Sequence, residues 1–273
     1  FDHATEAGVG FTLIKEIQGK LYAIVTYVVK DATSDYETTI TNLVTLEGNT
    51  WKLVAPSKKV ITGLLGIESL EYYSGTFYVG GYQGGVTKLY TDPTTKETYW
   101  ETVQTEEPYD LDRFILLKTY KGKLYACGET SEYKKGNTYS MNSDEVWTLE
   151  LNQKKTCKSI DEAKGKLYIG TEDYTSSPSQ YQETKKYNPT QQPPNLSIRS
   201  LYTYDGKDWK AITFNTTGLS EGQIVVTTRA IEEYRGKTYI AVETNYDYEF
   251  ATQPSLYTLE DNGTLTPITW WEK

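Results

Sequence analysis

The stretch GKLYACGET, residues 122–130, nearly recurs four more times in this chain of 273 residues. The other copies are GKLYAIVTY at 19–27, GTFYVGGYQ at 75–83, GKLYIGTED at 165–173 and GKTYIAVET at 236–244. A short phrase repeated in this way indicates one supersecondary unit used several times, and an internal repeat decides the fold before any local signal does.

A second phrase confirms the period. An apolar residue, then Tyr, Val or Trp, then Thr follows each copy of the first phrase once, at Leu43-Val44-Thr45, Leu89-Tyr90-Thr91, Val146-Trp147-Thr148, Leu201-Tyr202-Thr203 and Leu256-Tyr257-Thr258. Each repeat is therefore expected to hold four short strands. An apolar strand precedes a Gly-Lys turn, the Lys-Leu-Tyr strand runs back, the strand with the second phrase follows, and the last strand often opens on an aromatic residue such as Trp51 or Trp209.

Four-stranded units that repeat about every 50 residues are typical of a β-propeller. The sequence predicts an all-β fold, a five-bladed β-propeller of four-stranded antiparallel blades. Residues 1–10 are expected to form an N-terminal extension and 11–269 a single domain, with blades at 11–55, 61–104, 111–157, 158–214 and 225–269. Only 154–158 remain at the join of the third and fourth blades. Either the third blade has a stunted outer strand or the fourth has a displaced inner strand.

One segment resembles a Kelch repeat. Phe77 to Trp100 contains the double glycine Gly80-Gly81, then Tyr90, then Trp100, and the stretch LYTYDGKDW from Leu201 is similar. The resemblance implies propeller architecture across about residues 11–269.

Composition limits the partners. The formal net charge is -9 and the sequence pI is about 4.9, so the chain lacks the cationic surface that nucleic acid requires. The longest apolar run, VITGLLGI from Val60, is too short to span a bilayer, so no membrane insertion is expected. The chain begins with Phe and shows no leader, which favours a mature secreted or cell-surface chain, with a trimmed fragment as the alternative. Asn195, Asn215 and Asn262 begin glycosylation sequons that fit secretion.

The links between the second and third strands vary most in length, and they emerge on one face of a propeller. They are rich in tyrosine and acidic residues, which dominate recognition surfaces. Glu129, Glu172 and Glu243 share the eighth position counted from the turn glycine, where two other repeats have Thr26 and Tyr82. Solvated strand ends are the alternative reading of these acids. The predicted ligand-binding residues are Tyr27, Tyr36, Tyr82, Glu129, Tyr133, Glu172, Tyr174, Glu243, Tyr246 and Tyr248.

The chain has one histidine, His3, near its terminus, so histidine-dependent nucleophile triads, histidine-type zinc sites and cysteine clusters are not expected. No phosphate-binding loop is present and no cofactor is expected. Paired-carboxylate glycoside chemistry is the enzyme class left open. Because the best acids repeat, the sequence favours a non-enzymatic, lectin-like module that binds a glycan or protein. The alternatives are a homo-oligomeric subunit of an extracellular surface layer or filament, and a glycoside hydrolase.

Two further features are local. Phe1-Asp2-His3, with a free amino terminus, can wrap Cu(II) or Ni(II) in a square plane of nitrogen ligands. Cys127 and Cys157 are the only cysteines, and an even count in a secreted chain favours a disulfide. Cys127 as a small buried core residue is the alternative.

Overall fold

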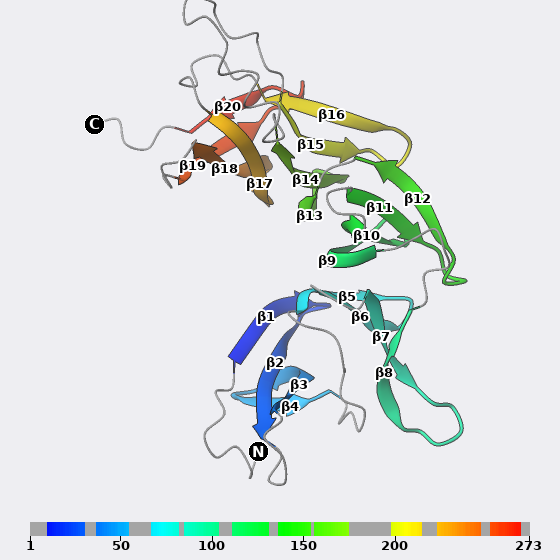
Figure 1. The fold of residues 1–273 in the computed structure, drawn as a ribbon. Helices are drawn as coiled ribbons and strands as arrows, with labels where there is room; N and C mark the ends of the chain where they lie inside the picture. The colour runs from blue at the N-terminus through cyan, green and yellow to red at the C-terminus, as the bar shows by residue number, and fades with distance from the viewer. Residues whose placement is uncertain are drawn as a thin grey trace, which may run out of the picture. The chain divides into compact units, whose positions relative to one another are not determined.

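The structure is a computed structural model that describes residues 10–30, 37–54, 67–81, 85–103, 111–130, 136–153, 156–174, 198–214, 223–246 and 252–268. All of its regular elements are β-strands, which confirms the all-β prediction (Figure 1). Among these residues no helix is long and apolar enough to cross a membrane.

The first three sheets each contain four consecutive antiparallel strands. The first holds β1 (Gly10–Ile17), β2 (Lys20–Lys30), β3 (Glu37–Glu47) and β4 (Thr50–Leu53). The second holds β5 (Ile67–Tyr73), β6 (Thr76–Gly81), β7 (Val86–Thr91) and β8 (Thr98–Thr102). The third holds β9 (Leu111–Tyr120), β10 (Lys123–Thr130), β11 (Gly136–Met141) and β12 (Trp147–Asn152).

The remaining strands form one sheet of eight. They are β13 (Cys157–Ala163), β14 (Lys166–Tyr174), β15 (Ile198–Tyr204), β16 (Trp209–Phe214), β17 (Gln223–Tyr234), β18 (Lys237–Tyr246), β19 (Thr252–Leu259) and β20 (Leu265–Pro267). β13 to β16 and β17 to β20 are each joined in chain order, and a β14–β17 ladder connects the two sets. Repeated four-stranded antiparallel units are therefore present, whereas five separate blades stay a prediction.

The β14–β17 ladder has a simple cause. β13 begins at Cys157, which pairs with Thr171, so the last three residues of β14 extend beyond it. β17 is 12 residues long, and its Val225 to Thr227 pair with these residues of β14 instead. The end of β14 is thus paired with the next repeat, while the Glu172 amide bonds to the Thr156 carbonyl oxygen.

The hairpin turns follow the repeated glycines, shifted by one residue from the prediction. The two turn residues are the glycine and the residue before it, and both have positive φ, for example 54° at Gln18 and 74° at Gly19. Two-residue turns of type I′ need positive φ at both positions, and their backbone twist matches that of the flanking strands. The lysine predicted to share the turn instead begins the next strand, as Lys20 does in β2.

The third repeat differs from the prediction. The phrase at Val146-Trp147-Thr148 was expected in a third strand, but Trp147 opens β12, the fourth strand of its sheet. The third strand is β11, which the phrase pattern did not identify. The Asn142 side chain accepts hydrogen bonds from the Asp144 and Val146 amides and shapes the turn between these strands. The join that looked too short therefore needs neither a stunted nor a displaced strand.

The first strand of each repeat has a register shift at an equivalent position in its ladder with the second strand. Pairing skips one residue in four of these strands, namely Thr12 in β1, Glu68 in β5, Lys158 in β13 and Arg229 in β17. The β9–β10 ladder is irregular at the same level, between Cys127 and Glu129. A β-bulge of this kind bends the strand and redirects the side chain of the extra residue.

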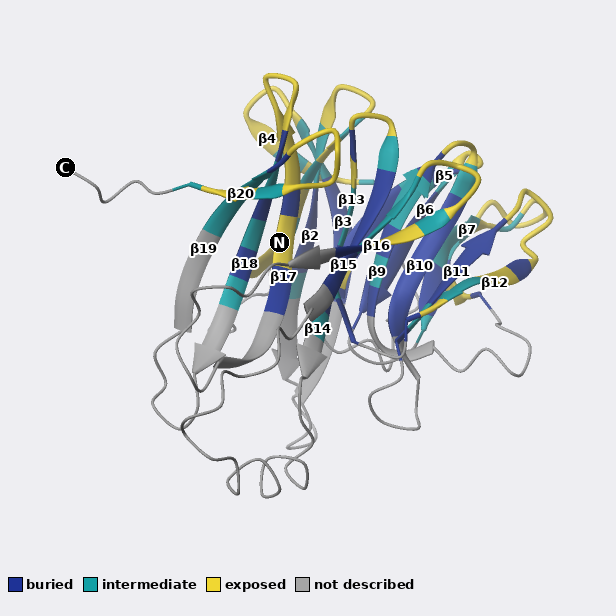
Figure 2. Cartoon of the chain, turned by 90° about the horizontal axis from the view of Figure 1, so that it is seen from above, coloured by how far each residue is buried: buried dark blue, intermediate teal, exposed yellow. Residues whose placement is uncertain are grey.

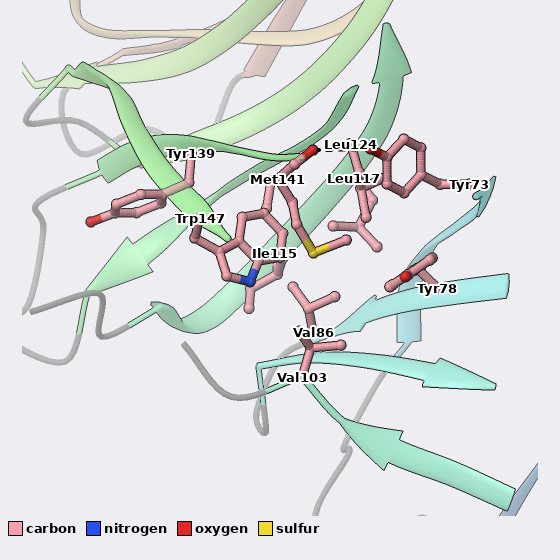
Figure 3. Packing of buried hydrophobic residues seen from close by; sticks show 11 residues of the cluster. Tyr73, Tyr78, Val86, Val103, Ile115, Leu117, Leu124, Tyr139, Met141 and Trp147 are labelled. Carbon is pink, nitrogen blue, oxygen red and sulfur yellow. Dashed lines mark hydrogen bonds between the residues drawn. The ribbon is translucent and has the colours of Figure 1, made fainter. Parts of the chain in front are cut away.

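The chain divides into two compact units. The N-terminal unit comprises Phe1–Tyr133 and Tyr139–Leu149, and the C-terminal unit comprises Lys134–Thr138 and Glu150–Lys273. In the N-terminal unit β5 packs against β1 and β9, and in the C-terminal unit β13 packs against β17. Burial is greatest in middle strands such as β6 and β10, whereas β1 and β4 have no buried residue and the hairpin turns are exposed (Figure 2). Figure 3 shows one buried cluster of the N-terminal unit, around Ile115, Leu124 and Met141.

Candidate functional site

Two of the three repeated glutamates lie in one row across three strands of the C-terminal unit. Glu172 of β14 pairs with Thr227 of β17, and Thr227 pairs in turn with Glu243 of β18. Residues directly opposite each other in neighbouring strands place their side chains on the same face of a sheet. Glu172 and Glu243 therefore face the same side, with Thr227 between them. We call Glu172, Thr227 and Glu243 the acid row.

A basic residue holds each carboxylate of the acid row. The Lys158 Nζ lies 3.0 Å from the Glu172 Oε2, and the Arg229 Nε lies 2.5 Å from the Glu243 Oε2. Lys158 and Arg229 are the extra residues of the bulges in β13 and β17. Each bulge thus directs one cationic side chain towards one of the two glutamates. Bulges next to active sites often redirect a side chain in this way.

The acid row is partly open to solvent. The side chains of Glu172 and Glu243 are 13% and 23% exposed, and those of Lys158 and Arg229 are 20% and 49% exposed. Thr227 between the acids is buried. The two carboxylates are therefore not fully closed off from solvent, and Arg229 is the most exposed of the four charged side chains.

Buried hydroxyl groups fix the backbone beneath the row. The Ser159 Oγ donates to the carbonyl oxygen of Thr228 at 3.0 Å, and the Ser200 Oγ lies 3.2 Å from the Thr228 Oγ1. The Glu172 amide donates to the carbonyl oxygen of Thr156 at 3.0 Å. These bonds tie β17 to β13 and β15, so the acids stand on rigid strands rather than on a loop.

Glu129, the third repeated acid, lies in the N-terminal unit. It stands near the end of β10 and pairs with Arg113 of β9. It is therefore not a member of the acid row. Within the described part of the chain, no group of three or more His, Cys, Asp or Glu residues could hold a metal ion.

Three predicted loop tyrosines lie in strands. Tyr27 pairs with Ile40 in the β2–β3 ladder, Tyr174 with Val225 and Tyr246 with Gln223. The prediction that these residues belong to loops is wrong because the ladders continue beyond the repeated phrase. The other predicted positions that lie outside the described residues are His3, Tyr36, Tyr82, Tyr133, Asn195, Asn215 and Tyr248.

The remaining predicted sites fall on described residues. Cys127 and Cys157 are both disulfide-bonded, and neither is free. Asn262 is exposed in the turn between β19 and β20, where its Oδ1 accepts a hydrogen bond from the Thr264 amide at 2.9 Å.

The sequence contained a signal for the two cations that was missed. Lys158 and Arg229 each stand seven residues before their turn glycines, Gly165 and Gly236, as Glu172 and Glu243 stand seven after them. Matching distances on either side of a two-residue turn place residues at nearly the same level of a hairpin. Thr227 had no such signal, because its pairing to β14 crosses between repeats.

Neither a protein-family model nor a curated protein matches this chain. Among solved structures, one that is similar is a GH43 β-xylosidase/α-arabinofuranosidase from a compost microbial metagenome in complex with xylotriose. The TM-score is 0.41 and the identity 10%, over 99% of this chain and 97% of that one. Another is the GH32 β-fructofuranosidase of Bombyx mori, with a TM-score of 0.38 and 11% identity over 97% of this chain and 65% of that one.

Both similar structures are glycoside hydrolases, which contradicts our prediction of a non-enzymatic, lectin-like binding module. That prediction assumed that repeated acids form separate, similar binding sites. The β14–β17 ladder removes this assumption, because it brings two of the repeated acids into one row.

Proposed function

We propose that this chain is a glycoside hydrolase whose carboxylate pair is Glu172 and Glu243. The observation that carries the proposal is the acid row, with two glutamates on one sheet face and one strand between them. Glycoside hydrolysis commonly needs two carboxyl groups on either side of the scissile bond, one to protonate the leaving oxygen and one to act on the sugar carbon or on water.

The spacing of the row favours inversion of configuration. Glu172 and Glu243 are separated by two strand spacings of about 4.8 Å each, so their Cα atoms are about 10 Å apart, and their side chains point to the same face of the sheet. Inverting enzymes keep their carboxyl groups about 6.5–9.5 Å apart to admit a water molecule, whereas retaining enzymes need about 5–5.5 Å. Two glutamates separated by one intervening strand fit the longer carboxyl-to-carboxyl distance of inverting enzymes.

The two cations suggest different roles for the two acids. Lys158 is the more confined cation, so we assign Glu172 beside it as the base that accepts a proton from the attacking water. Arg229 is half-exposed; when it turns away, the Glu243 carboxyl group can take up a proton from solvent and donate it to the glycosidic oxygen. Arg229 can also hold a sugar hydroxyl in its displaced position.

The test is turnover of aryl glycosides. The panel includes nitrophenyl β-xyloside and α-arabinofuranoside, with sucrose assayed in parallel, so that several types of sugar are represented. Removing a general acid or base typically costs about 10²–10⁴-fold, so we expect losses of that order in kcat for Glu172→Gln and Glu243→Gln. The matched control is Glu47→Gln, which breaks another ion pair, to Lys52 at 2.6 Å, outside the acid row.

The product anomer, followed by proton NMR, tests the stereochemistry, and inversion is expected. Unchanged kcat in both row variants, with melting temperatures like the parent's, would refute the assignment. Retention of configuration would refute the water-mediated geometry. We further propose that the protein is secreted or held at the cell surface, which mass spectrometry of culture supernatant and cell-surface fractions of the source can test.

A further inference from the structure

A cavity of about 350 Å³ lies in the N-terminal unit, apart from the residues of the acid row. It is bordered by the β5–β6 turn, the end of β7 and the turn before β12. We infer that this cavity is a second binding site, for a neutral saccharide. We call it the tyrosine cavity, after Tyr73, Tyr78 and Tyr90, which line it.

A charged pair provides the polar wall of the tyrosine cavity. The Lys88 Nζ lies 2.6 and 2.7 Å from the two carboxylate oxygens of Glu145, and the Tyr78 hydroxyl donates to the Glu145 Oε1 at 3.4 Å. A lysine beside a carboxylate presents a donor and an acceptor at adjacent positions. Adjacent hydroxyl groups of a sugar match this arrangement, because one can accept from the ammonium while the next donates to the carboxylate.

Aromatic rings provide the other walls. Tyr90 is half-buried, packs against Tyr99 with ring centroids 5.3 Å apart, and has the Lys88 Nζ 5.8 Å from its ring centroid. Tyr73 and Tyr78 lie at one end of the buried cluster in Figure 3. The Tyr73 hydroxyl donates to the carbonyl oxygens of Gly122 and Met141, both at 3.3 Å. Rings held in this way offer the apolar surface that the C–H face of a sugar contacts.

The Glu145 backbone is held in a conformation that is unusual for its residue type. Its φ is +60°, in the left-handed region that non-glycine residues seldom adopt. Asn142 maintains it, because the Asn142 carbonyl oxygen accepts from the Glu145 amide at 3.1 Å and its side chain accepts from the neighbouring Val146 amide. Backbone strain that is maintained by specific contacts is often found at binding sites. Here it positions the carboxylate against Lys88 before any ligand arrives.

The charges select a neutral ligand. Lys88 is the only lysine or arginine among the residues that line the cavity, and its Nζ is also 3.7 Å from the Glu101 carboxylate. One cation shared by two carboxylates leaves a negative surplus that disfavours phosphate or carboxylate ligands. A cationic ligand would have to displace Lys88, whose side chain is 15% exposed. A neutral polyhydroxylated molecule meets neither obstacle.

The experiment measures trisaccharide binding to the full chain that carries Glu172→Gln and Glu243→Gln. These substitutions remove the proposed hydrolysis, so binding at the tyrosine cavity is measured without turnover. The probes are xylotriose and maltotriose, with inorganic phosphate as the anionic comparison, and the readout is isothermal calorimetry with tyrosine fluorescence. We expect saturable binding of at least one trisaccharide and none of phosphate.

The variants locate the binding. Glu145→Ala and Tyr90→Ala are each expected to weaken trisaccharide affinity about tenfold or more, as loss of a charged hydrogen bond or an aromatic contact does. Glu47→Ala, which removes an ion pair that does not border the cavity, is expected to leave it unchanged. Glu145→Gln, which keeps an acceptor oxygen, covers the case in which an alanine variant does not fold.

Several outcomes overturn the inference. They are the absence of binding by both trisaccharides, binding of phosphate in place of sugar, and trisaccharide affinity that Glu145→Gln and Tyr90→Ala leave unaltered. Failure here is separate from failure of the proposed function. Turnover of aryl glycosides that depends on the acid row, without trisaccharide binding at the tyrosine cavity, rejects only the second site.

Discussion

Gly80→Ala is expected to be strongly destabilising, because Gly80 faces a serine that bridges two repeats. Ser69 of β5 pairs directly with Gly80 of β6. The Ser69 Oγ donates to the Ile115 carbonyl oxygen at 3.1 Å and accepts from the Leu117 amide at 3.0 Å, so it links β5 to β9. A Cβ atom on Gly80 would lie 2.4 Å from that Ile115 oxygen and 3.0 Å from the Ser69 Oγ.

The magnitude follows from these contacts. The closest contact is to a backbone atom of a buried strand, so β9 must move away, and overpacking of this kind costs about 1–3 kcal/mol. Such a movement also breaks the two buried hydrogen bonds of Ser69, each worth about 1 kcal/mol. We therefore expect Gly80→Ala to lower the free energy of unfolding by about 3–5 kcal/mol.

Urea unfolding followed by tryptophan fluorescence measures this change. The matched control is Gly10→Ala, because a Cβ atom on Gly10 has no atom within 4 Å. We expect the control to stay within about 0.5 kcal/mol of the parent. A loss below about 1 kcal/mol for Gly80→Ala would show that β9 relaxes freely and would refute the reasoning.

The same geometry recurs in the C-terminal unit and offers a second check. Ser159 pairs with Gly170, and a Cβ atom on Gly170 would lie 2.1 Å from the Ser159 Oγ and 2.7 Å from the Thr228 Cβ. Here the nearest atom belongs to a side chain. Ser159→Gly should therefore recover part of the stability lost in Gly170→Ala, and purely additive losses in the double variant would count against this explanation.

Two further predictions concern titration and redox state. Burial raises the pKa of Tyr73, Tyr78 and Tyr168, and the Glu145 carboxylate adds to this effect at Tyr78. Since these folded-state pKa values exceed the unfolded value of about 10, their contribution to stability is complete below pH 10 and is lost as the pH rises further. Absorbance at 295 nm should show a late-titrating group of tyrosines and urea midpoints should fall over the same range, whereas ionisation of all tyrosines together would contradict this. Unfolded, unreduced protein should show no free thiol, and reduction of Cys127 and Cys157 should cost about 3–4 kcal/mol for a loop of about 30 residues; two free thiols before reduction would exclude the disulfide.

Local signals in the sequence predicted the repeat, the hairpin turns and the all-β class. These features depend on neighbouring residues: a left-handed turn pair such as Gln18-Gly19 requires a residue type that tolerates positive φ, and strand alternation is read within a few positions. The third strand was correctly placed in four repeats by its repeated phrase. It was misplaced in the third repeat because Trp147 satisfies the same pattern from a fourth strand.

The candidate site depended on contacts that no local pattern specifies. The sequence identified Glu172 and Glu243 as equivalent residues of separate repeats, but only the β14–β17 ladder makes them neighbours of Thr227. That ladder forms because β13 starts late and β17 extends to satisfy the exposed end of β14, a competition for backbone hydrogen bonds between distant segments. The bulges that aim Lys158 and Arg229 likewise arise from the register between strands. Propensity and periodicity thus determined the repeating unit, whereas pairing between units decided which side chains meet, because register is set by the packing of the whole sheet.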